Sequence, residues 1–373
     1  MVVVGAGISG ALMANELTQL GCDVLILDRR EPVHGSTLAS SALLEFELDV
    51  PLHLLARRLG SARARRAYGR SLRSVERVAE IVRALHLRCG FEPRRSLYLA
   101  GDEHGHRALT AEVEARKRAG IGGRFLDAKA LWHDYAIERT GAIESEGCAV
   151  VNPVQLAAGL LRRAIARGAR VCSPADVRHV RSSRRRVQVE TADGWIVDAR
   201  SVVFCTGYEL VEGLELPHHR VKSTWAVATR KVHAMPGWLS TTTVWEASDP
   251  YLYLRTTVDG RIIAGGEDVA SSTMHTDARL LDAKAARLMD KIGALLPTLE
   301  CELSHTWAGA FGESPTGLPL VDRVPGIPGA YLVAGFGGNG ITHSVTAAEV
   351  VRGWIAGRTD PDAGLYRLPS GNG

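Results

Sequence analysis

The chain begins with a short run of valines followed at once by three glycines at fixed spacing. These are Gly5, Gly7 and Gly10, and residues 11–20 then show the apolar spacing of a helix. A second apolar run follows the helix and ends in Asp28. The order strand, glycine turn, helix, strand and acid is typical of a dinucleotide-binding βαβ unit. It constrains the start of the fold to a parallel α/β sheet.

Each glycine of this pattern has a separate physical role. Gly5 allows the tight turn, Gly7 lets the backbone approach a pyrophosphate, and Gly10 lets the helix pack on the strand. Ile8 and Ser9 open the helix, whose free N–H groups and positive dipole end would face the phosphates. The pattern therefore predicts where a dinucleotide would lie along the chain.

Asp28 bears on which dinucleotide is bound. Its carboxylate can accept hydrogen bonds from a ribose 2′-hydroxyl and would repel a 2′-phosphate. NADP is therefore disfavoured, although Arg29 and Arg30 follow directly.

Composition limits the classes of function. A chain of 373 residues with 46% hydrophobic residues is long enough for two domains. The net charge of +4 is too small to indicate nucleic-acid binding. Residues 57–77 are rich in arginine, but alanine and leucine interleave them at helical spacing, which favours a solvated helix face.

The six cysteines are far apart and form no metal-binding pattern, so no metal is expected. Cys172 and Cys205 lie in apolar runs that predict buried thiols, which fits a cytoplasmic location. There is no run of 18 apolar residues, so no membrane span is expected.

Periodicity divides the chain into an α/β part and an inserted, largely antiparallel part. We expect helices over residues 39–59, 61–88, 153–167, 277–296 and 341–355, with two more within 105–135. We expect strands over residues 96–100, 169–173, 187–191, 195–198, 202–205, 224–231, 241–245, 251–257, 261–265 and 330–334.

The fold class expected is a Rossmann-like, dinucleotide-binding α/β domain. An α+β domain with an antiparallel sheet is inserted into it. We assign residues 1–88, 146–215 and 303–373 to the dinucleotide-binding domain, and residues 89–145 and 216–302 to the substrate domain.

Three strand-to-glycine junctions favour FAD over a nicotinamide cofactor. They are Gly5–Gly10, Thr206-Gly207 and Gly335–Gly340. A nicotinamide enzyme needs one such turn, whereas FAD lies along a whole domain and needs backbone approach at several points. The last helix would direct its positive N-terminus at the pyrimidine end of the flavin.

These motifs together resemble the D-amino acid oxidase and glycine oxidase family of FAD-dependent oxidoreductases over nearly the whole chain. The segments that carry the resemblance are GAGISG with Asp28, His34-Gly35-Ser36-Thr37 with Ser40-Ser41, Val203–Gly207, Trp307-Ala308-Gly309 with Pro315–Pro319, and the terminal GFGGNGIT.

The resemblance implies that FAD is the cofactor and that the dinucleotide-binding domain is a FAD-binding domain of the glutathione reductase type. It also implies that a hydride passes to flavin N5 from a C–H next to an amine nitrogen. The imine is then hydrolysed. It also implies a set of cofactor-binding residues: Gly5, Gly7, Ile8, Ser9, Gly10, Asp28, Arg29, Arg30, His34, Gly35, Ser36, Thr37, Ser40, Ser41, Thr206, Gly207, Gly335, Gly337, Gly338, Asn339, Gly340, Ile341 and Thr342. His34 is the candidate for covalent attachment, and non-covalent FAD is the default.

One departure from the family pattern concerns the substrate. Phe311 stands where the resemblance expects an arginine that pairs with a substrate carboxylate. Either another cation such as Arg255 binds a carboxylate, or the substrate is an amine without one there. Alternation places Tyr251, Tyr253 and Arg255 on one strand face, and Trp245 on the preceding strand can join them.

We therefore expect a FAD-dependent enzyme that oxidises a small amine or amino acid derivative, with no nucleic-acid partner. The electron acceptor is left open between oxygen and a carrier. Two other interpretations remain: an NAD-dependent Rossmann dehydrogenase, which leaves the last glycine-rich segment unused, and a flavin-binding subunit of a larger complex, supported only by the basic helix.

Overall fold

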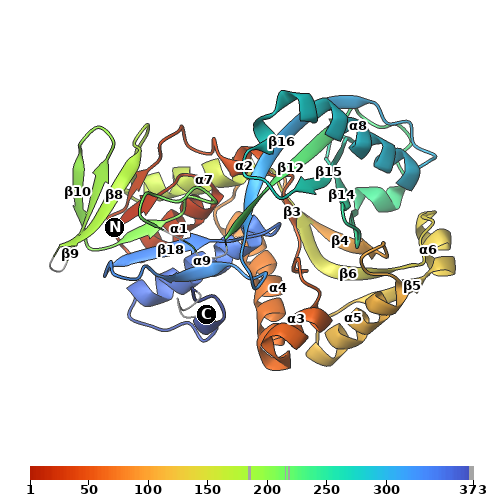
Figure 1. Ribbon diagram of the computed structural model, residues 1–373, viewed down its shortest axis with the longest axis horizontal. Coiled ribbons are helices and arrows are strands. Elements are labelled where there is room, and N and C mark those ends of the chain that lie inside the picture. Colours follow the sequence, from red (N-terminus) through yellow and green to blue (C-terminus); the bar gives the residue numbers. More distant parts are fainter. Residues whose placement is uncertain (184–185, 215, 217–218, 369–373) are drawn as a thin grey trace.

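The computed structural model describes residues 1–183, 186–214, 216 and 219–368. Two lobes lie side by side (Figure 1). The first contains a six-stranded sheet in the order β17-β18-β11-β1-β2-β7, parallel except for β17. The strands are β1 (Val2–Val4), β2 (Leu25–Leu27), β7 (Arg170–Cys172), β11 (Val202–Phe204), β17 (Leu320–Arg323) and β18 (Ala330–Ala334).

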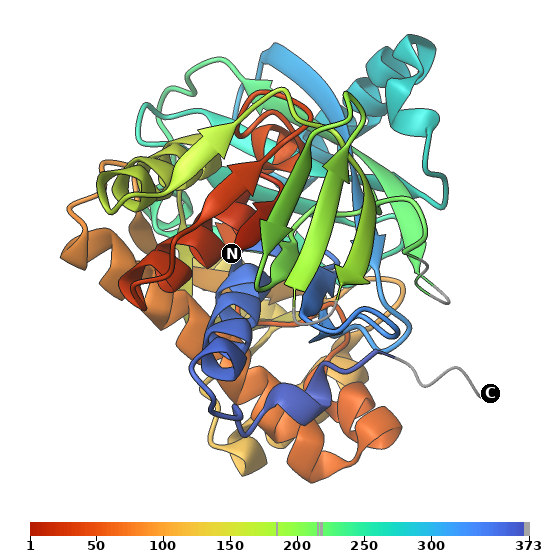
Figure 2. The same cartoon turned by 90° about the vertical axis from the view of Figure 1, so that its left-hand side faces the viewer.

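Alternating side chains pack the two faces of this sheet against different elements. Val3 belongs to the core under the helices, whereas Val2 and Val4 belong to the core under a small sheet. The helices are α1 (Ile8–Gln19), α4 (Ser61–Ala84), α7 (Pro153–Ala166) and α9 (Gly340–Ile355). The small sheet, in front in Figure 2, contains β8 (Val177–Ser183), β9 (Arg186–Thr191) and β10 (Ile196–Ala199).

The second lobe contains a nine-stranded sheet. Its neighbouring strands are antiparallel except for the parallel pair of β13 and β4. In spatial order they are β16 (Leu303–Glu313), β12 (Arg220–Thr229), β15 (Ile262–Val269), β14 (Leu252–Thr256), β13 (Thr242–Glu246), β4 (Glu92–Leu99), β6 (Gly141–Val150) and β3 (Leu43–Leu44), with β5 (Arg124–Asp127) on β6. This confirms the expected fold class.

The remaining helices surround these sheets (Figure 1). The α-helices are α2 (Ser36–Ala39), α3 (Leu52–Leu59), α5 (His106–Ala119), α6 (Ala128–Tyr135) and α8 (Ala278–Leu295). Three short 3₁₀-helices are η1 (Gly237–Ser240), η2 (Met274–Thr276) and η3 (Ala363–Leu365).

Several sequence expectations are wrong in detail. The helix expected over 39–59 is absent up to Pro51, because the chain there runs extended beside the second sheet and α3 begins only after the proline. Residues 303–313, assigned to the FAD-binding domain, form β16 in the second sheet, where they pair with β12. The thiol of Cys172 is exposed because β7 is an edge strand, whereas Cys205 is buried as expected.

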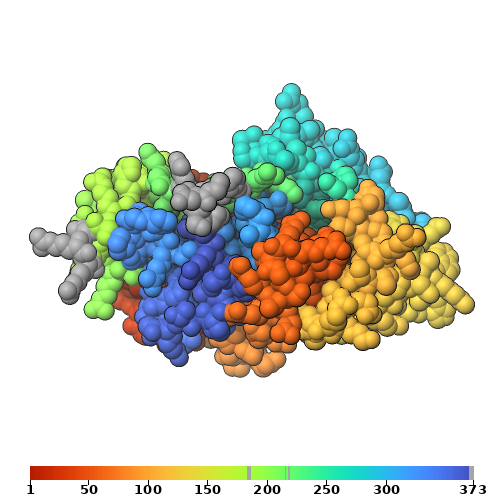
Figure 3. All heavy atoms as spheres, turned by 60° about the horizontal axis from the view of Figure 1, so that its bottom comes forward, coloured from red at the N-terminus to blue at the C-terminus, as the bar shows by residue number. Residues whose placement is uncertain are grey.

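Most arginines of residues 57–77 are exposed, as expected of a solvated helix face, but some of those on α4 contact the C-terminal segment. Arg70 is buried and pairs with Asp360 at 2.9 Å, and Arg66 pairs with Asp362 at 2.8 Å. Figure 3 shows the C-terminal segment (blue) against α3 and α4 (orange). Arg66 and Arg70 therefore join α4 to the C-terminal segment.

Within the described residues, no helix has both the length and the apolar character needed to cross a bilayer.

Candidate active site

Residues of both lobes line a cavity of about 600 Å³, and the three glycine junctions form part of its wall. These junctions follow β1, β11 and β18, which are adjacent parallel strands, so their carboxyl ends lie at one edge of the sheet. Ligands of open α/β sheets bind at this edge. The glycine turns that the sequence singled out separately therefore line one site.

The turn between β1 and α1 has the close packing that the pattern predicts. Gly5 has φ +107°, and a Cβ there would lie 2.3 Å from the carbonyl oxygen of Cys205. A Cβ on Gly10 would lie 1.8 Å from the carbonyl oxygen of Gly5. Gly10 is therefore a packing residue outside the cavity wall, while Gly5 and Gly7 line it.

The acid after β2 lines the cavity and also braces the turns around it. Asp28 Oδ2 accepts a hydrogen bond from the Ala6 N–H at 2.6 Å, and Oδ1 accepts one from the Arg30 N–H at 2.8 Å. Arg29 and Arg30 line the cavity beside it and pair with Glu209. Asp28 is thus placed where a ribose could reach it.

The segment around α2 covers the start of α1. The hydroxyl of Thr37 accepts the N–H of Ile8 at 2.9 Å. Of the expected cofactor residues in this region, those on the cavity wall are Ile8, Ser9, Gly35, Ser36, Thr37, Ser40 and Ser41. His34 is half-exposed, lies off the wall and has its Nδ1 3.6 Å from Glu31.

The last glycine loop leads into α9 at the other end of the cavity. Its wall residues are Gly335, Gly337, Gly338, Asn339, Gly340 and Ile341, together with Thr206 and Gly207 from the junction after β11. Thr342 lies behind the wall, where its hydroxyl donates to the carbonyl oxygen of Glu45 at 3.3 Å.

These residues fit FAD. The N-cap residues Gly7 and Asn339 make no side-chain cap hydrogen bond to α1 or α9, so the positive ends of two helices lie at one cavity. The glycines of the turns next to these helices have no side chain, so a ligand can approach the backbone along the cavity. Asp28 and the α1 turn would hold the ADP half, and the loop before α9 would meet the flavin ring.

The second lobe contributes an aromatic wall. Tyr251, Tyr253, Trp245 and Phe311 all line the cavity, as the sequence predicted. Trp245 stacks on Tyr98 with ring centroids 3.7 Å apart. Trp245 belongs to β13, Tyr253 to β14 and Phe311 to β16, and Tyr251 directly precedes β14.

Arg255 is not part of this wall, which corrects the expectation that it joins the two tyrosines there. Its side chain is buried, and it donates hydrogen bonds to the carbonyl oxygens of Ser41 and Thr256. Burial, with the nearby charge of Arg94, lowers its pKa to about 10. Arg255 therefore holds the chain after α2 in place, and its guanidinium is engaged by backbone carbonyls.

Sequence reasoning missed the segment from Glu45 to Asp49, which lies along the last glycine loop. The Gly338 N–H donates to Asp49 Oδ2 at 3.1 Å, and the Asn339 side chain donates to the carbonyl oxygen of Glu47 at 2.8 Å. Glu45, Glu47 and Asp49 all line the cavity. The alternation of acids with Phe46 and Leu48 was the signal, since it marks an extended segment with two different faces.

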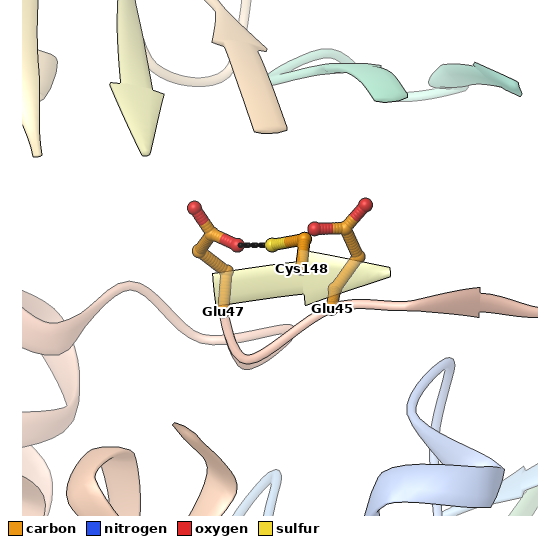
Figure 4. Close-up of side chains that lie close together, drawn as sticks. All are labelled: Glu45, Glu47 and Cys148. Atoms are coloured by element: carbon orange, nitrogen blue, oxygen red, sulfur yellow. Dashed lines mark hydrogen bonds between the residues drawn. The ribbon is translucent and has the colours of Figure 1, made fainter. Parts of the chain in front are cut away.

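Glu45, Glu47 and Cys148 form the one group with metal-ligand geometry found among the described residues, within 4.8 Å of one another (Figure 4). The Cys148 thiol donates to Glu47 at 3.3 Å, and Arg116 neutralises Glu47 at 3.0 Å. Burial, with the nearby acids, raises the pKa of Cys148 well above its usual value. A protonated thiol is a poor metal ligand, so we interpret the group as a buried polar cluster.

Comparison with protein families gives one match that spans most of the chain. The model of the family DAO, described as FAD dependent oxidoreductase, matches residues 1–354.

Solved structures share the fold over nearly the full length. Glycine oxidase from Geobacillus kaustophilus is 22% identical, with a TM-score of 0.83 over 100% of this chain and 98% of that chain. L-proline dehydrogenase from P. horikoshii is 20% identical, with a TM-score of 0.81 over 98% and 96%.

A curated relative, the putative Rieske 2Fe-2S iron-sulfur protein YhfW of Bacillus subtilis, is 21% identical over 215 residues. The match covers 57% of this chain and 41% of that protein, so it spans less than half of the relative's length.

Proposed function

The chain belongs to the DAO family of FAD-dependent oxidoreductases, and on that premise we propose that it oxidises a C–N bond of an amine or amino acid derivative. Membership confirms the resemblance drawn from the sequence and FAD as the cofactor. It disfavours a nicotinamide-dependent dehydrogenase. The two structural neighbours are named for glycine and L-proline, which supports substrates of this class.

One observation carries the choice of substrate. Phe311 lines the cavity at the position where the family resemblance expects an arginine, and Arg255 does not line the cavity to replace it. A phenyl ring offers apolar surface and no charge-assisted hydrogen bond to a carboxylate. This favours an amine with an apolar body over a small zwitterion such as glycine.

Bound FAD supplies the acceptor for the hydride, at flavin N5. When the carbon loses a hydride and the neutral amine nitrogen loses a proton, a C=N bond forms between them, and water hydrolyses this imine to a carbonyl compound and ammonia or an amine. The chain contributes position and environment. Trp245, Tyr253 and Phe311 cover the reacting carbon with apolar surface, and the N-terminus of α9 stabilises negative charge by about 0.3–2 kcal/mol. No protein nucleophile is required.

An anaerobic screen tests this function. Amines and D- and L-amino acids are added to the yellow holoprotein, and bleaching of the flavin bands identifies those that are oxidised. Admitting oxygen, or a dye as a stand-in carrier, then shows which acceptor restores the colour. A protein that no amine or amino acid bleaches would contradict the proposal.

A further inference from the structure

The charges on the cavity wall are divided unequally between the two lobes. On the first lobe, the arginines Arg29, Arg30 and Arg178 lie among acids that pair with them. On the substrate side, Lys222 is the one Lys or Arg among the described wall residues, and it pairs with Glu313 at 2.9 Å. The acids of that side are Glu45, Glu47, Asp49, Glu103, Glu246, Asp249, Asp268 and Glu313.

Some of these acids are neutralised by the protein itself. Arg116 pairs with Glu47 at 3.0 Å and Arg139 pairs with Glu246 at 2.8 Å. Within the described chain, the carboxylates of Asp49, Asp268 and Glu45 form no ion pair with a lysine or arginine.

Two of these carboxylates also have an oxygen without a hydrogen-bond partner. Tyr251 donates to Asp268 Oδ2 at 2.9 Å, but Oδ1 is buried and lacks a partner among the described residues. Thr243 donates to Glu45 Oε1 at 2.7 Å, while Oε2 is equally unpartnered, and the residue is only 8% exposed. An unpaired carboxylate oxygen in a buried position is costly, so Asp268 Oδ1 indicates a group that the described residues do not supply.

We propose that the substrate binds as a cation, with its positive group held by the carboxylates of Asp268 and Asp49, and that it has no carboxylate at this end of the cavity. Asp268 lies on β15 beside Tyr251, and Asp49 lies against the glycine loop. Both acids line the cavity on its substrate side. Burial and the neighbouring Glu47 raise the pKa of Glu45 to about 8, so Glu45 is largely protonated at pH 7 and is not part of the cation site. Lys222 is engaged by Glu313, so the side that binds substrate attracts cations and repels anions.

This inference rests on the proposed amine oxidation for the identity of the site, but its test is a binding measurement. The probes are three molecules of equal chain length: butylamine, which is cationic at pH 7, neutral butan-1-ol and anionic butanoate. Each is titrated anaerobically into the oxidised holoprotein, by calorimetry and by the change in the flavin spectrum. We expect butylamine to bind at least tenfold more tightly than butan-1-ol, and butanoate to bind most weakly.

The matched variants are Asp268→Asn and Asp282→Asn. Both remove one negative charge, but Asp282 is exposed on α8, away from the cavity. Asp268→Asn keeps an acceptor for Tyr251 and should weaken butylamine binding about tenfold, because a hydrogen bond to a charged group is lost. Its affinity for butan-1-ol should stay the same, and Asp282→Asn should resemble the parent protein.

The outcomes separate this inference from the proposed function. Butanoate binding as tightly as butylamine, or an Asp268→Asn variant with unchanged selectivity, overturns the cation site even if amines are oxidised. Selective butylamine binding that depends on Asp268 supports the site, even if no amine or amino acid bleaches the flavin. In that second case the proposed oxidation fails by itself.

Discussion

Asp49 Oδ2 lies 3.1 Å from the backbone nitrogen of Gly338, so an acid of one segment is fixed against the loop that would meet the flavin. Asp49 also lies close to Gly337, because a Cβ at that position would lie 2.0 Å from the same carboxylate oxygen. Gly337 has φ +57°, which glycine adopts without strain. The cofactor loop and the substrate side of the cavity are therefore linked through one carboxylate.

This carboxylate should make cation binding depend on pH. Burial, together with the charges of Glu313 and Asp268, raises the pKa of Asp49 to about 6. The hydrogen bond from Gly338 and the charge of Lys222 oppose this rise. The protonated acid cannot attract a cation, so the affinity for butylamine should fall as the pH drops through 6 and be restored above it. Titrations from pH 5 to 8 measure this.

The variant Asp49→Asn tests whether Asp49 causes the pH dependence of butylamine binding. The variant lacks the ionisable group and should show weaker affinity with a flatter dependence between pH 5 and 7. An identical pH profile in the parent and the variant would assign the titration to another group.

Asp28 should govern FAD affinity. Replacing it by asparagine removes a charge-assisted hydrogen bond to the ribose, worth roughly 1.5–3 kcal/mol, so the Kd for FAD should rise about 10- to 100-fold. Flavin content after purification and titration of the apoprotein measure the change. Asp23→Asn, at an exposed acid before β2, is the control. Full FAD occupancy in Asp28→Asn at submicromolar flavin would count against the assignment.

Phe311→Arg should restore preference for small zwitterions. The new guanidinium would lie on β16, on the wall that faces the flavin, where it could pair with a carboxylate. We expect the kcat/KM for glycine or D-alanine to rise at least tenfold relative to the best amine. Phe311→Leu, which keeps apolar surface, should not produce this shift. Efficient oxidation of glycine by the unmodified enzyme would show that the interpretation of Phe311 is wrong.

The flavin should be held without a covalent bond. His34 is the residue considered for attachment from the sequence, and it is half-exposed and off the cavity wall. Acid precipitation should therefore release the yellow colour into the supernatant. Colour that stays in the protein pellet, and disappears from it in His34→Ala, would reverse this expectation.

Local patterns were sufficient to identify many of the residues that line the cavity at the glycine junctions. Gly5, Asp28 and Gly335–Gly340 each belong to a short motif whose backbone geometry follows from the residue types. Strand pairing then brings the motifs together, because β1, β11 and β18 are adjacent in one sheet. Such motifs can be identified without knowing the rest of the fold.

The substrate side depends on tertiary contacts that no short pattern records. Alternation placed Arg255 with Tyr253, but the carbonyl of Ser41, far away in the sequence, engages the guanidinium. The role proposed for Asp268 depends on its position in the folded protein, where Tyr251 donates a hydrogen bond to it from beside the neighbouring strand. The apolar spacing of residues 39–51 was compatible with a helix until the pairing of β3 with β6 made the segment extended.

The most direct test of the central claim is the visible spectrum of the purified protein during anaerobic titration with an amine. Flavin absorption in the resting protein, bleached in proportion to added amine and not by butanoate, is the result expected of an FAD-dependent amine oxidoreductase. A colourless protein that binds NADH, or a flavin spectrum that no amine or amino acid changes, would contradict it.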